Sequence, residues 1–353
     1  MAKIILDCDL MRHKNSGLYQ YCLNVGNYVN RTLEENDSKD KIKYYTPAAE
    51  ANSFDNSDHS IVEKKYHKTI RPFLWDCDVW HAPFQSGRIF PRQNKRTKVL
   101  LTVHDLNCLH EGKPECEQQK SLAHTQKLID RADALVCISE FAKADVLANC
   151  DVKNKPVHVI HNGTHRLHEP MLNSLSYKPR MPFLFGMGYV NRKKNFHVLL
   201  PMLIDNNYEL VIAGRLDEPD YIQSMMEHAR KLGIEDRVHL LGPVSEEEKA
   251  WYLKNCLAYM HPSLAEGFGA PVVEAMAFGK PMFLSNYTSL PEIAGNVAFY
   301  FSSYDHEHMY SVFTEGMATY RKNGLYKRII QKGSEYNWEK KAIEYLDVYR
   351  SLM

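Results

Sequence analysis

The sequence predicts an α/β protein of two domains, each a parallel sheet with helices on both faces. Short apolar runs alternate with longer amphipathic stretches along the chain, which is the order of strands and helices in a parallel sheet. A length of 353 residues exceeds what one hydrophobic core usually serves. A stretch at 166–181, with Pro170 and Pro179 and no clean periodicity, indicates a linker between two series of such runs.

The first series predicts four strands. The predicted strands, each with the helix that follows it, are 3–9 with a helix from Leu18, 98–105 with 119–132, 134–139 with 140–149, and a final strand at 157–163. The region 48–68 is polar and lacks periodicity, so we expect a mobile loop there, either an acceptor-binding element or a plain surface insertion.

The second series predicts six strands in a doubly wound pattern. The predicted strands and helices are 182–188 with 194–205, 208–214 with 219–233, 238–243 with 245–256, 257–263 with 271–279, 281–286 with 290–295, and a last strand at 298–301. Residues 338–353 have the apolar spacing of an amphipathic helix, which must pack against another element.

Composition excludes several classes of protein. The 44 Lys and Arg against 43 Asp and Glu give a net charge of +1, which provides no general field for nucleic acid. No apolar run approaches the roughly 20 residues that span a bilayer, and we expect no signal peptide. The eight cysteines include no C-x-x-C pair, so we expect a cytoplasmic protein in which thiols such as Cys137 and Cys256 are buried.

The strongest motif is HPSLAEGFGAPVVEAMAFGKP at 261–281, in which seven residues separate Glu266 and Glu274. Gly269 allows the backbone to approach a ligand, and Pro271 suits the first turn of a helix that Glu274 joins. A helix N-terminus favours a diphosphate, while carboxylates accept hydrogen bonds from sugar and ribose hydroxyls. The alternative is a surface loop with one helix-capping glutamate.

Three further segments predict ligand contacts. Residues 192–194 are cations at the start of a predicted helix, where their charge opposes the helix dipole. An anion such as pyrophosphate between these cations and the helix end would make the arrangement favourable. A solvated basic helix start is the alternative. Gly17 follows the first strand, where a loop meets ligands at the carboxyl edge of a sheet. His104 and Asp105 end another strand, although such a histidine is often structural.

Together these segments resemble the family-4 retaining glycosyltransferases, from the first domain through SLPEIAG at 289–295. The resemblance implies the GT-B fold, in which two Rossmann-like domains face across a cleft and a C-terminal helix crosses back to the N-terminal domain. We therefore expect an acceptor-binding domain at 1–165, joined by a helix at about 338–353, and a nucleotide-sugar-binding domain at 166–337.

The resemblance also implies a role for each matching residue. In the second domain, Glu266 contacts the donor sugar, Glu274 contacts the ribose, and the backbone of Phe268 and Gly269 faces the sugar and phosphates. Lys194 binds the diphosphate beside Lys193, which replaces the usual arginine, and backbone near Val244 contacts the base. In the first domain, His104 approaches the transferred sugar with Asp105 beside it, and Gly17 approaches the donor phosphates and the acceptor. Tyr189 stands where many relatives have an arginine that contacts a phosphate. In this chain that contact is either absent or supplied by Arg192 or Arg215.

By this resemblance the protein transfers a hexose-type sugar, mannosyl-like or glucosyl-like, from a nucleoside diphosphate sugar to a hydroxyl of a saccharide or lipid-linked glycan. We expect retained anomeric configuration, no metal, and no cofactor beyond the donor, in surface polysaccharide or glycan assembly. Two alternatives remain open: a nucleotide-sugar epimerase of the same fold, and a silent nucleotide-binding partner.

Two basic stretches, 64–73 and 87–98, combine cations with aromatics. They are consistent with peripheral contact at the inner face of a membrane or with a phosphorylated acceptor, and ordinary solvated surface is the alternative. The sequence predicts no nucleic-acid partner and leaves the oligomeric state open.

Overall fold

The computed structural model describes residues 2–14, 16–85, 89–91, 96–164, 175–204 and 206–353. The chain forms two compact units, Met1–Gly163 with Asn337–Met353, and Thr164–Tyr336. The sequence placed the boundaries after 165 and 337; residue 165 and most of the predicted linker, 165–174, lie outside the described residues.

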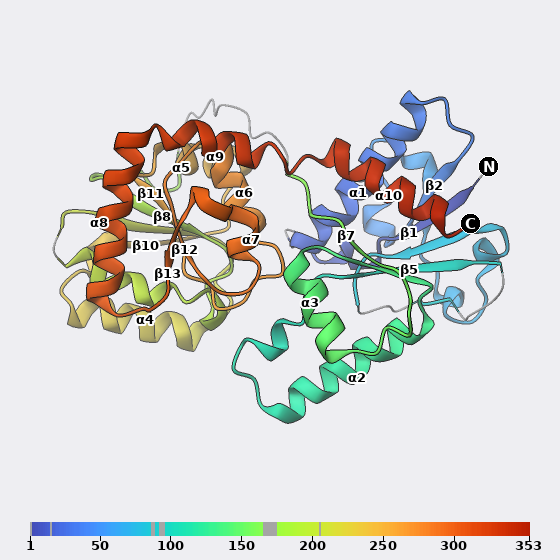
Figure 1. Ribbon diagram of the computed structural model, residues 1–353, viewed down its shortest axis with the longest axis horizontal. Helices are drawn as coiled ribbons and strands as arrows, with labels where there is room; N and C mark the ends of the chain where they lie inside the picture. Colours follow the sequence, from blue (N-terminus) through green and yellow to red (C-terminus); the bar gives the residue numbers. More distant parts are fainter. Residues whose placement is uncertain (1, 15, 86–88, 92–95, 165–174, 205) are drawn as a thin grey trace. The chain divides into compact units, whose positions relative to one another are not determined.

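The first unit contains a seven-stranded sheet in the order β3-β2-β1-β4-β5-β6-β7, with every pair parallel. The strands are β1 (Lys3–Asp7), β2 (Lys41–Thr46), β3 (Ser60–Val62), β4 (Val79–Ala82), β5 (Lys98–Val103), β6 (Ala134–Cys137) and β7 (Val157–Val159). Three helices, α1 (Gly17–Glu35), α2 (Glu115–Arg131) and α3 (Glu140–Asn149), connect them, with α1 on one face and α2 and α3 on the other (Figure 1).

The polar region 48–68 is not the plain loop that the sequence predicted. It contains three short 3-10 helices, Ala48–Glu50, Ser57–His59 and Lys65–Lys68, and the edge strand β3. This strand has only three half-buried residues and pairs with β2 alone, so it shows too little apolar alternation to be recognised from sequence.

The second unit contains a six-stranded parallel sheet in the order β10-β9-β8-β11-β12-β13. Its strands are β8 (Phe183–Met187), β9 (Glu209–Ala213), β10 (Val238–Gly242), β11 (Ala258–His261), β12 (Met282–Ser285) and β13 (Phe299–Phe301). Its helices are α4 (Pro219–Lys231), α5 (Glu246–Asn255), α6 (Ala270–Ala277), α7 (Leu290–Ala294), α8 (His306–Asn323) and α9 (Leu325–Gly333). All six predicted strands are present, so the two-domain α/β prediction is confirmed.

The helix predicted at 194–205 is replaced by two 3-10 helices, Arg192–Lys194 and Phe196–Leu203. Asn195 between them is left-handed, with φ of 58°, which breaks helical continuity. Pro201 in the second piece lacks an N–H for a helical hydrogen bond. The basic residues therefore lie in a tight turn rather than at the start of an α-helix.

The last helix, α10 (Trp338–Ser351), belongs to the first unit and packs against α1 (Figure 1). The Tyr345 hydroxyl lies 2.5 Å from the hydroxyl of Tyr21 on α1. A Cβ added to Gly163 would lie only 2.5 Å from Trp338, so the chain passes closely beneath the start of α10. The return of the C-terminal helix to the N-terminal domain is confirmed.

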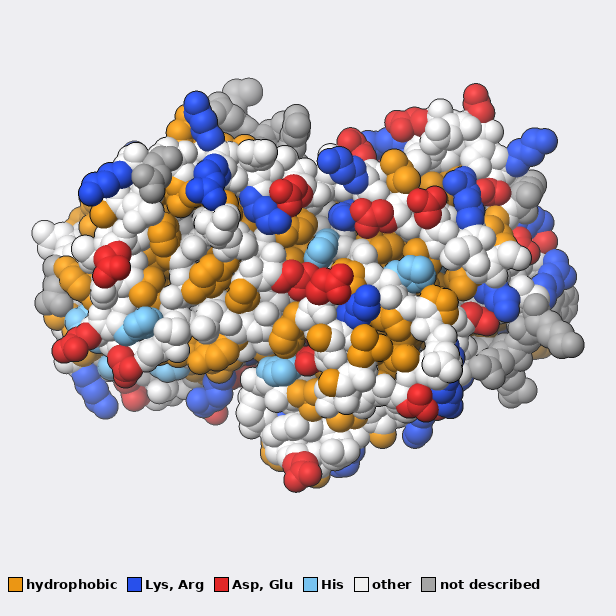
Figure 2. Space-filling view, in the orientation of Figure 1, with side chains coloured by type: hydrophobic (Ala, Val, Ile, Leu, Met, Phe, Trp, Pro, Cys, Tyr) orange, Lys and Arg blue, Asp and Glu red, His pale blue; other side chains and the backbone are white. Residues whose placement is uncertain are grey.

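Each unit has its own apolar core, the first including Trp80, Leu101 and Ile129, the second Phe196, Ile212 and Met260. As expected, Cys137 and Cys256 are buried, and burial raises the pKa of each thiol to about 12. Figure 2 shows acidic and basic side chains interspersed on the viewed face. Within the described ranges, no helix combines the length and the apolar character needed to cross a bilayer.

Candidate active site

The main polar cluster of the second unit lies at the carboxyl ends of β8 and β11. These two strands are neighbours at the point where the sheet reverses its order, with β9 and β10 on one side and β12 and β13 on the other. Open parallel sheets bind ligands at such a reversal, beyond the carboxyl ends of the strands. Gly188 follows β8 there, and His261 is the last residue of β11.

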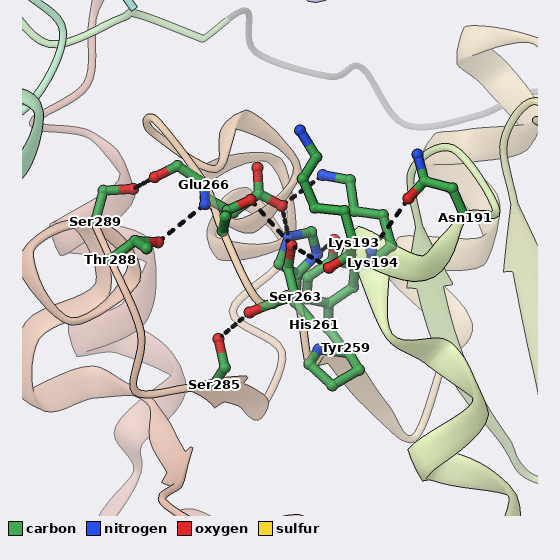
Figure 3. Close-up of polar contacts among 12 residues, drawn as sticks. Asn191, Lys193, Lys194, Tyr259, His261, Ser263, Glu266, Ser285, Thr288 and Ser289 are labelled. Atoms are coloured by element: carbon green, nitrogen blue, oxygen red, sulfur yellow. Dashed lines mark hydrogen bonds and ion pairs between the residues drawn. The ribbon is translucent and has the colours of Figure 1, made fainter. Parts of the chain in front are cut away.

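Glu266 is the centre of this cluster and is only 8% exposed. Its Oε1 accepts hydrogen bonds from Lys194 Nζ at 2.5 Å and from His261 Nε2 at 2.7 Å (Figure 3). The Nδ1 of His261 lies 3.1 Å from the Tyr259 hydroxyl. One carboxylate oxygen thus receives two donors from two different segments.

These neighbours keep Glu266 ionised. Burial alone would raise its pKa, but the Lys194 charge and the His261 hydrogen bond hold the pKa well below its usual range. Burial lowers the pKa of His261, opposed by Glu266 and reinforced by Lys194, so the imidazole is neutral at physiological pH. The cluster therefore combines a carboxylate and a neutral histidine with Lys194.

The loop that carries Glu266 is fastened through its backbone as well. The Glu266 N–H donates to Thr288 Oγ1 at 2.9 Å, and the Glu266 carbonyl accepts from Ser289 Oγ at 2.9 Å. Leu264 N–H donates to the carbonyl of Lys193 at 2.8 Å, which ties this loop to the basic turn. Lys193 thus contributes a backbone contact to the site.

The Lys194 side chain lies over the backbone of Gly188. A Cβ at Gly188 would lie 3.1 Å from Lys194 Cε, and a Cβ at Gly214 would lie 2.0 Å from the carbonyl oxygen of Gly188. Both glycines have positive φ, 141° and 145°. The ends of β8 and β9 can therefore approach each other, and Lys194 can cross them, only because both positions lack a side chain.

Helix α6 begins directly after the glycine-bearing loop. Gly269 is its N-cap, with φ of 88°, and a Cβ there would lie 2.7 Å from Leu290 Cδ2. Phe268 is 3% exposed, and its ring packs on Tyr336 with 5.4 Å between centroids. The Phe268 side chain therefore anchors the loop, and the ligand contact of its backbone stays a prediction.

Glu274 lies on α6 and pairs with a residue that the sequence did not single out. Its Oε1 accepts a hydrogen bond from Lys249 Nζ on α5 at 3.0 Å, and Lys249 also contacts Glu246 at 2.6 Å. Burial raises the pKa of Glu274, although Lys249 opposes that shift. Glu274 is half-buried, its side chain 22% exposed, so a ligand can still reach it.

His104 directly follows β5 in the first unit and is 7% exposed. Its Nε2 lies 2.8 Å from the carbonyl of Pro83, which can only accept, so Nε2 carries the proton and Nδ1 is an acceptor. Burial lowers the His104 pKa to about 4, against the opposing effect of the Pro83 hydrogen bond. The ring of Tyr21 packs edge-on against it at 4.7 Å.

The other predicted residues of the first unit have plainer surroundings. The Asp105 side chain accepts from the N–H of Asn107 at 3.0 Å, which gives it a turn-forming role. Gly17 is the first residue of α1, and a Cβ there would have no atom within 4 Å. Gly17 thus borders open space after β1, the strand at the order reversal of this sheet.

Val244 and the candidate phosphate cations lie in loops of the second unit. Val244 is half-buried between β10 and the start of α5. The guanidinium of Arg215 lies 4.4 Å from the ring centroid of Tyr189 and pairs with Asp217 at 2.5 Å. Arg215 thus contacts Tyr189, the residue that stands where many relatives have arginine, while Arg192 pairs with Glu218 at 3.6 Å.

Comparison with known proteins decides the family. The profile of the family "Glycosyl transferases group 1" matches residues 173–334, and that of "Glycosyltransferase Family 4" matches residues 44–166. Together the two matches cover most of both units. The chain belongs to the family-4 glycosyltransferases. The predictions of family and of enzymatic class are therefore confirmed.

Characterised relatives of this glycosyltransferase are distant. It is 22% identical over 303 residues to the O-antigen chain mannosyltransferase B of Escherichia coli, a match covering 78% of this chain and 74% of that protein. It is 25% identical over 277 residues to the serotype-specific mannosyltransferase WbdA of Escherichia coli, covering 71% of this chain but only 33% of WbdA.

Solved structures with the same fold match the glycosyltransferase over nearly its full length. Sucrose-phosphate synthase from Thermosynechococcus elongatus has a TM-score of 0.76 at 18% identity, covering 100% of this chain and 99% of that chain. Anabaena HepE, solved in complex with UDP-glucose, has a TM-score of 0.73 at 16% identity, covering 99% and 100%. These similarities establish the GT-B fold.

Two contacts of this glycosyltransferase are not predicted from its sequence. The sequence gives His261 no role beyond its place in the motif, although its position at a strand end, five residues before Glu266, is a usable signal. Lys249 lies in the run SEEEK, which has the composition of a solvated helix start. No feature of the sequence showed that its side chain would be only 12% exposed.

Proposed function

We propose that this glycosyltransferase transfers a hexose-type sugar, with mannose the first candidate, from a nucleoside diphosphate sugar to a saccharide or lipid-linked glycan. The ionised, buried Glu266 at the β8–β11 reversal, paired with Lys194 and His261, is the observation that carries this proposal. A fixed carboxylate accepts hydrogen bonds from sugar hydroxyls, which gives a donor sugar a defined orientation. Mannose is favoured because both relatives named above are mannosyltransferases, one of them an O-antigen chain mannosyltransferase.

The diphosphate would be stabilised by side chain and backbone rather than by a metal. Lys194 has three N–H donors and uses one on Glu266, so it can also donate to a phosphate oxygen. The N-terminus of α6, behind Gly269, adds N–H groups and the positive end of a helix dipole. These groups act on the charge that develops as the sugar leaves.

The proposed transfer retains the anomeric configuration. The bond between the anomeric carbon and the diphosphate oxygen breaks while the acceptor oxygen forms a new bond on the same face of the sugar. The departing phosphate oxygen takes the proton from the acceptor hydroxyl. His104 is suited to receive a hydroxyl of the transferred sugar, because its neutral imidazole keeps Nδ1 as an acceptor.

The proposal is tested first by ligand binding. A panel of GDP, UDP, GDP-mannose and UDP-glucose should include at least one compound that raises the melting temperature, because a ligand that binds only the folded state stabilises it. Product analysis with that donor then separates transfer from epimerisation. A sugar epimerised without transfer would contradict the proposed reaction.

The site assignment is tested by substitution. Lys194→Ala and Glu274→Ala should each lower kcat/KM for the donor by about 10- to 100-fold, because each removes a charge-assisted hydrogen bond worth about 1.5–3 kcal/mol. Arg230→Ala is the matched control, since this exposed cation of α4 pairs with Glu235 on the surface. Normal turnover by the first two variants would show that the donor binds elsewhere.

We also propose peripheral contact with an anionic membrane through Lys65–Lys68 and its flanks. Lys64, Lys65 and Lys68 are exposed there beside Tyr66, 50% exposed, and Ile70, 58% exposed. The second basic stretch supports this less, because its described residues Ile89 and Phe90 are buried and much of it lies outside the described ranges.

A triple substitution of Lys64, Lys65 and Lys68 to Gln should abolish sedimentation with phosphatidylserine vesicles at low salt, because each cation near such a surface contributes about 1 kcal/mol. Binding to neutral phosphatidylcholine vesicles should be weak for both proteins. Failure of the wild-type protein to sediment at low salt would remove the proposal.

A further inference from the structure

His261 contacts Glu266 from the end of a buried strand. It is the last residue of β11, 1% exposed, and its backbone belongs to a buried strand that pairs with β8 and β12. Lys194, the other partner of Glu266, reaches it from a 3-10 turn through a long flexible side chain. The two contacts therefore differ in the freedom of the donor.

The hydrogen bonds of His261 select one tautomer. An ionised Glu266 has no proton to donate, so the 2.7 Å contact requires a proton on His261 Nε2. The Nδ1 is then an acceptor and receives the hydroxyl proton of Tyr259 at 3.1 Å. Both ring nitrogens are thus occupied in a buried chain from Tyr259 through His261 to Glu266, which fixes the orientation of the imidazole.

Both side-chain donors of Glu266 converge on the same oxygen, Oε1. Figure 3 shows the second carboxylate oxygen pointing away from His261 and Lys194. When a donor on a buried strand holds one oxygen of a carboxylate, the second oxygen of that carboxylate points in a defined direction. This direction would be lost if Lys194 alone held Glu266, because the lysine can move with its partner.

We propose that His261 is a positioning residue that directs the second carboxylate oxygen of Glu266 toward a hydroxyl of the donor sugar, with Tyr259 holding the imidazole in place. The inference rests on the proposed function, because it concerns the sugar part of a nucleotide-sugar donor. It predicts that His261 affects recognition of the sugar and leaves recognition of the nucleotide unchanged.

The experiment compares the affinity for a nucleotide sugar with that for the corresponding nucleotide, measured by calorimetry with GDP-mannose and GDP and with UDP-glucose and UDP. His261→Phe keeps the ring volume and removes the donor to Glu266. This variant should lose about tenfold or more in affinity for the nucleotide sugar and in kcat/KM, while affinity for the nucleotide changes less than about twofold. His261→Gln, which keeps an N–H donor near the position of Nε2, should recover most of the loss.

Two further variants separate positioning from a general effect on folding. Tyr259→Phe removes only the hydroxyl. It should lower the selectivity, that is, the ratio of the affinity for the nucleotide sugar to that for the nucleotide, by a smaller factor than His261→Phe does. The inference therefore stays testable if His261→Phe fails to fold. His239→Phe is the matched control, since this histidine lies on β10, 3.5 Å from Glu209 at the amino end of β9, whereas His261 lies at the carboxyl end of β11. It should leave selectivity unchanged.

The outcomes distinguish the role of His261 from the proposed function. Unchanged selectivity in folded His261→Phe, or in Tyr259→Phe where the first variant does not fold, would overturn the role of His261 and leave the proposed function intact. Equal losses for nucleotide and nucleotide sugar would show a merely structural role. A wild-type protein that binds no nucleotide sugar would overturn both proposals.

Discussion

Glu266 shows how a buried carboxylate can remain charged. Desolvation would raise the pKa of this carboxyl, and the charge of Lys194, the hydrogen bond from His261 and the nearby Lys193 together lower it below its usual range. Lys194 supplies charge and His261 supplies a directed hydrogen bond, so the two contacts are not interchangeable.

The charge of Glu266 makes a testable contribution to stability. Its pKa is depressed in the folded state, so the stabilisation is present above its unfolded pKa of about 4.3 and is lost as the pH falls through the folded value. Glu266→Gln should therefore lower the free energy of unfolding at pH 7 by about 3–5 kcal/mol, since Lys194 loses its partner. The difference from the wild type should shrink below about pH 4.

Urea unfolding at pH 7 and at pH 3.5 measures this difference. Glu335→Gln serves as the control, because its pair with Lys332 is exposed and should contribute little at either pH. A gap between wild type and Glu266→Gln that stays constant with pH would mean that the neighbours do not hold Glu266 ionised.

At the level of elements, the packing of α10 explains why a glycine is needed at position 163. Asn162-Gly163 has the composition of a turn and is predicted from sequence to end the first domain. The structure adds that Trp338 lies directly over Gly163, where no side chain would fit. The same helix places Tyr345 against Tyr21, and Tyr21 packs on His104. The docking of α10 is thereby connected to the candidate site of the first unit.

Gly163→Ala should loosen this docking. The added methyl group would overlap Trp338, and overpacking of this kind typically costs about 1–3 kcal/mol. Hydrogen exchange should become faster in α10 and α1 and stay unchanged in the second unit.

Gly233→Ala provides the comparison, because Gly233 has φ of 68° and open space around its Cβ position, so only backbone strain is introduced. That variant should affect exchange near α4 and leave α10 protected. Equal protection of α10 in Gly163→Ala and wild type would show that the contact with Trp338 is not needed.

For the whole molecule, the sequence predicted the class of fold and most of the strands, because continuous apolar runs mark strands buried on both faces. It did not identify β2, β3 or β4, and strand order cannot be read from apolar runs that look alike. The carboxylate and lysine of the site were predicted from motif and spacing, and the structure brings Lys194 and Glu266 together. Lys249 was missed because the burial of a charged side chain depends on tertiary packing.

The return of α10 to the first unit has a consequence for synthesis on the ribosome. Residues 164–336 form a continuous segment, whereas the first unit needs both 1–163 and 337–353. The second unit can therefore complete its fold while the chain is still growing. The first unit must wait for the later segment, and until then the surface that receives Tyr345 and Tyr349, including Tyr21 and His81, is uncovered. In a nascent chain stalled before residue 337, the second unit would be folded and the first unit incomplete, with apolar surface exposed. Chaperones and proteases recognise such partly folded states.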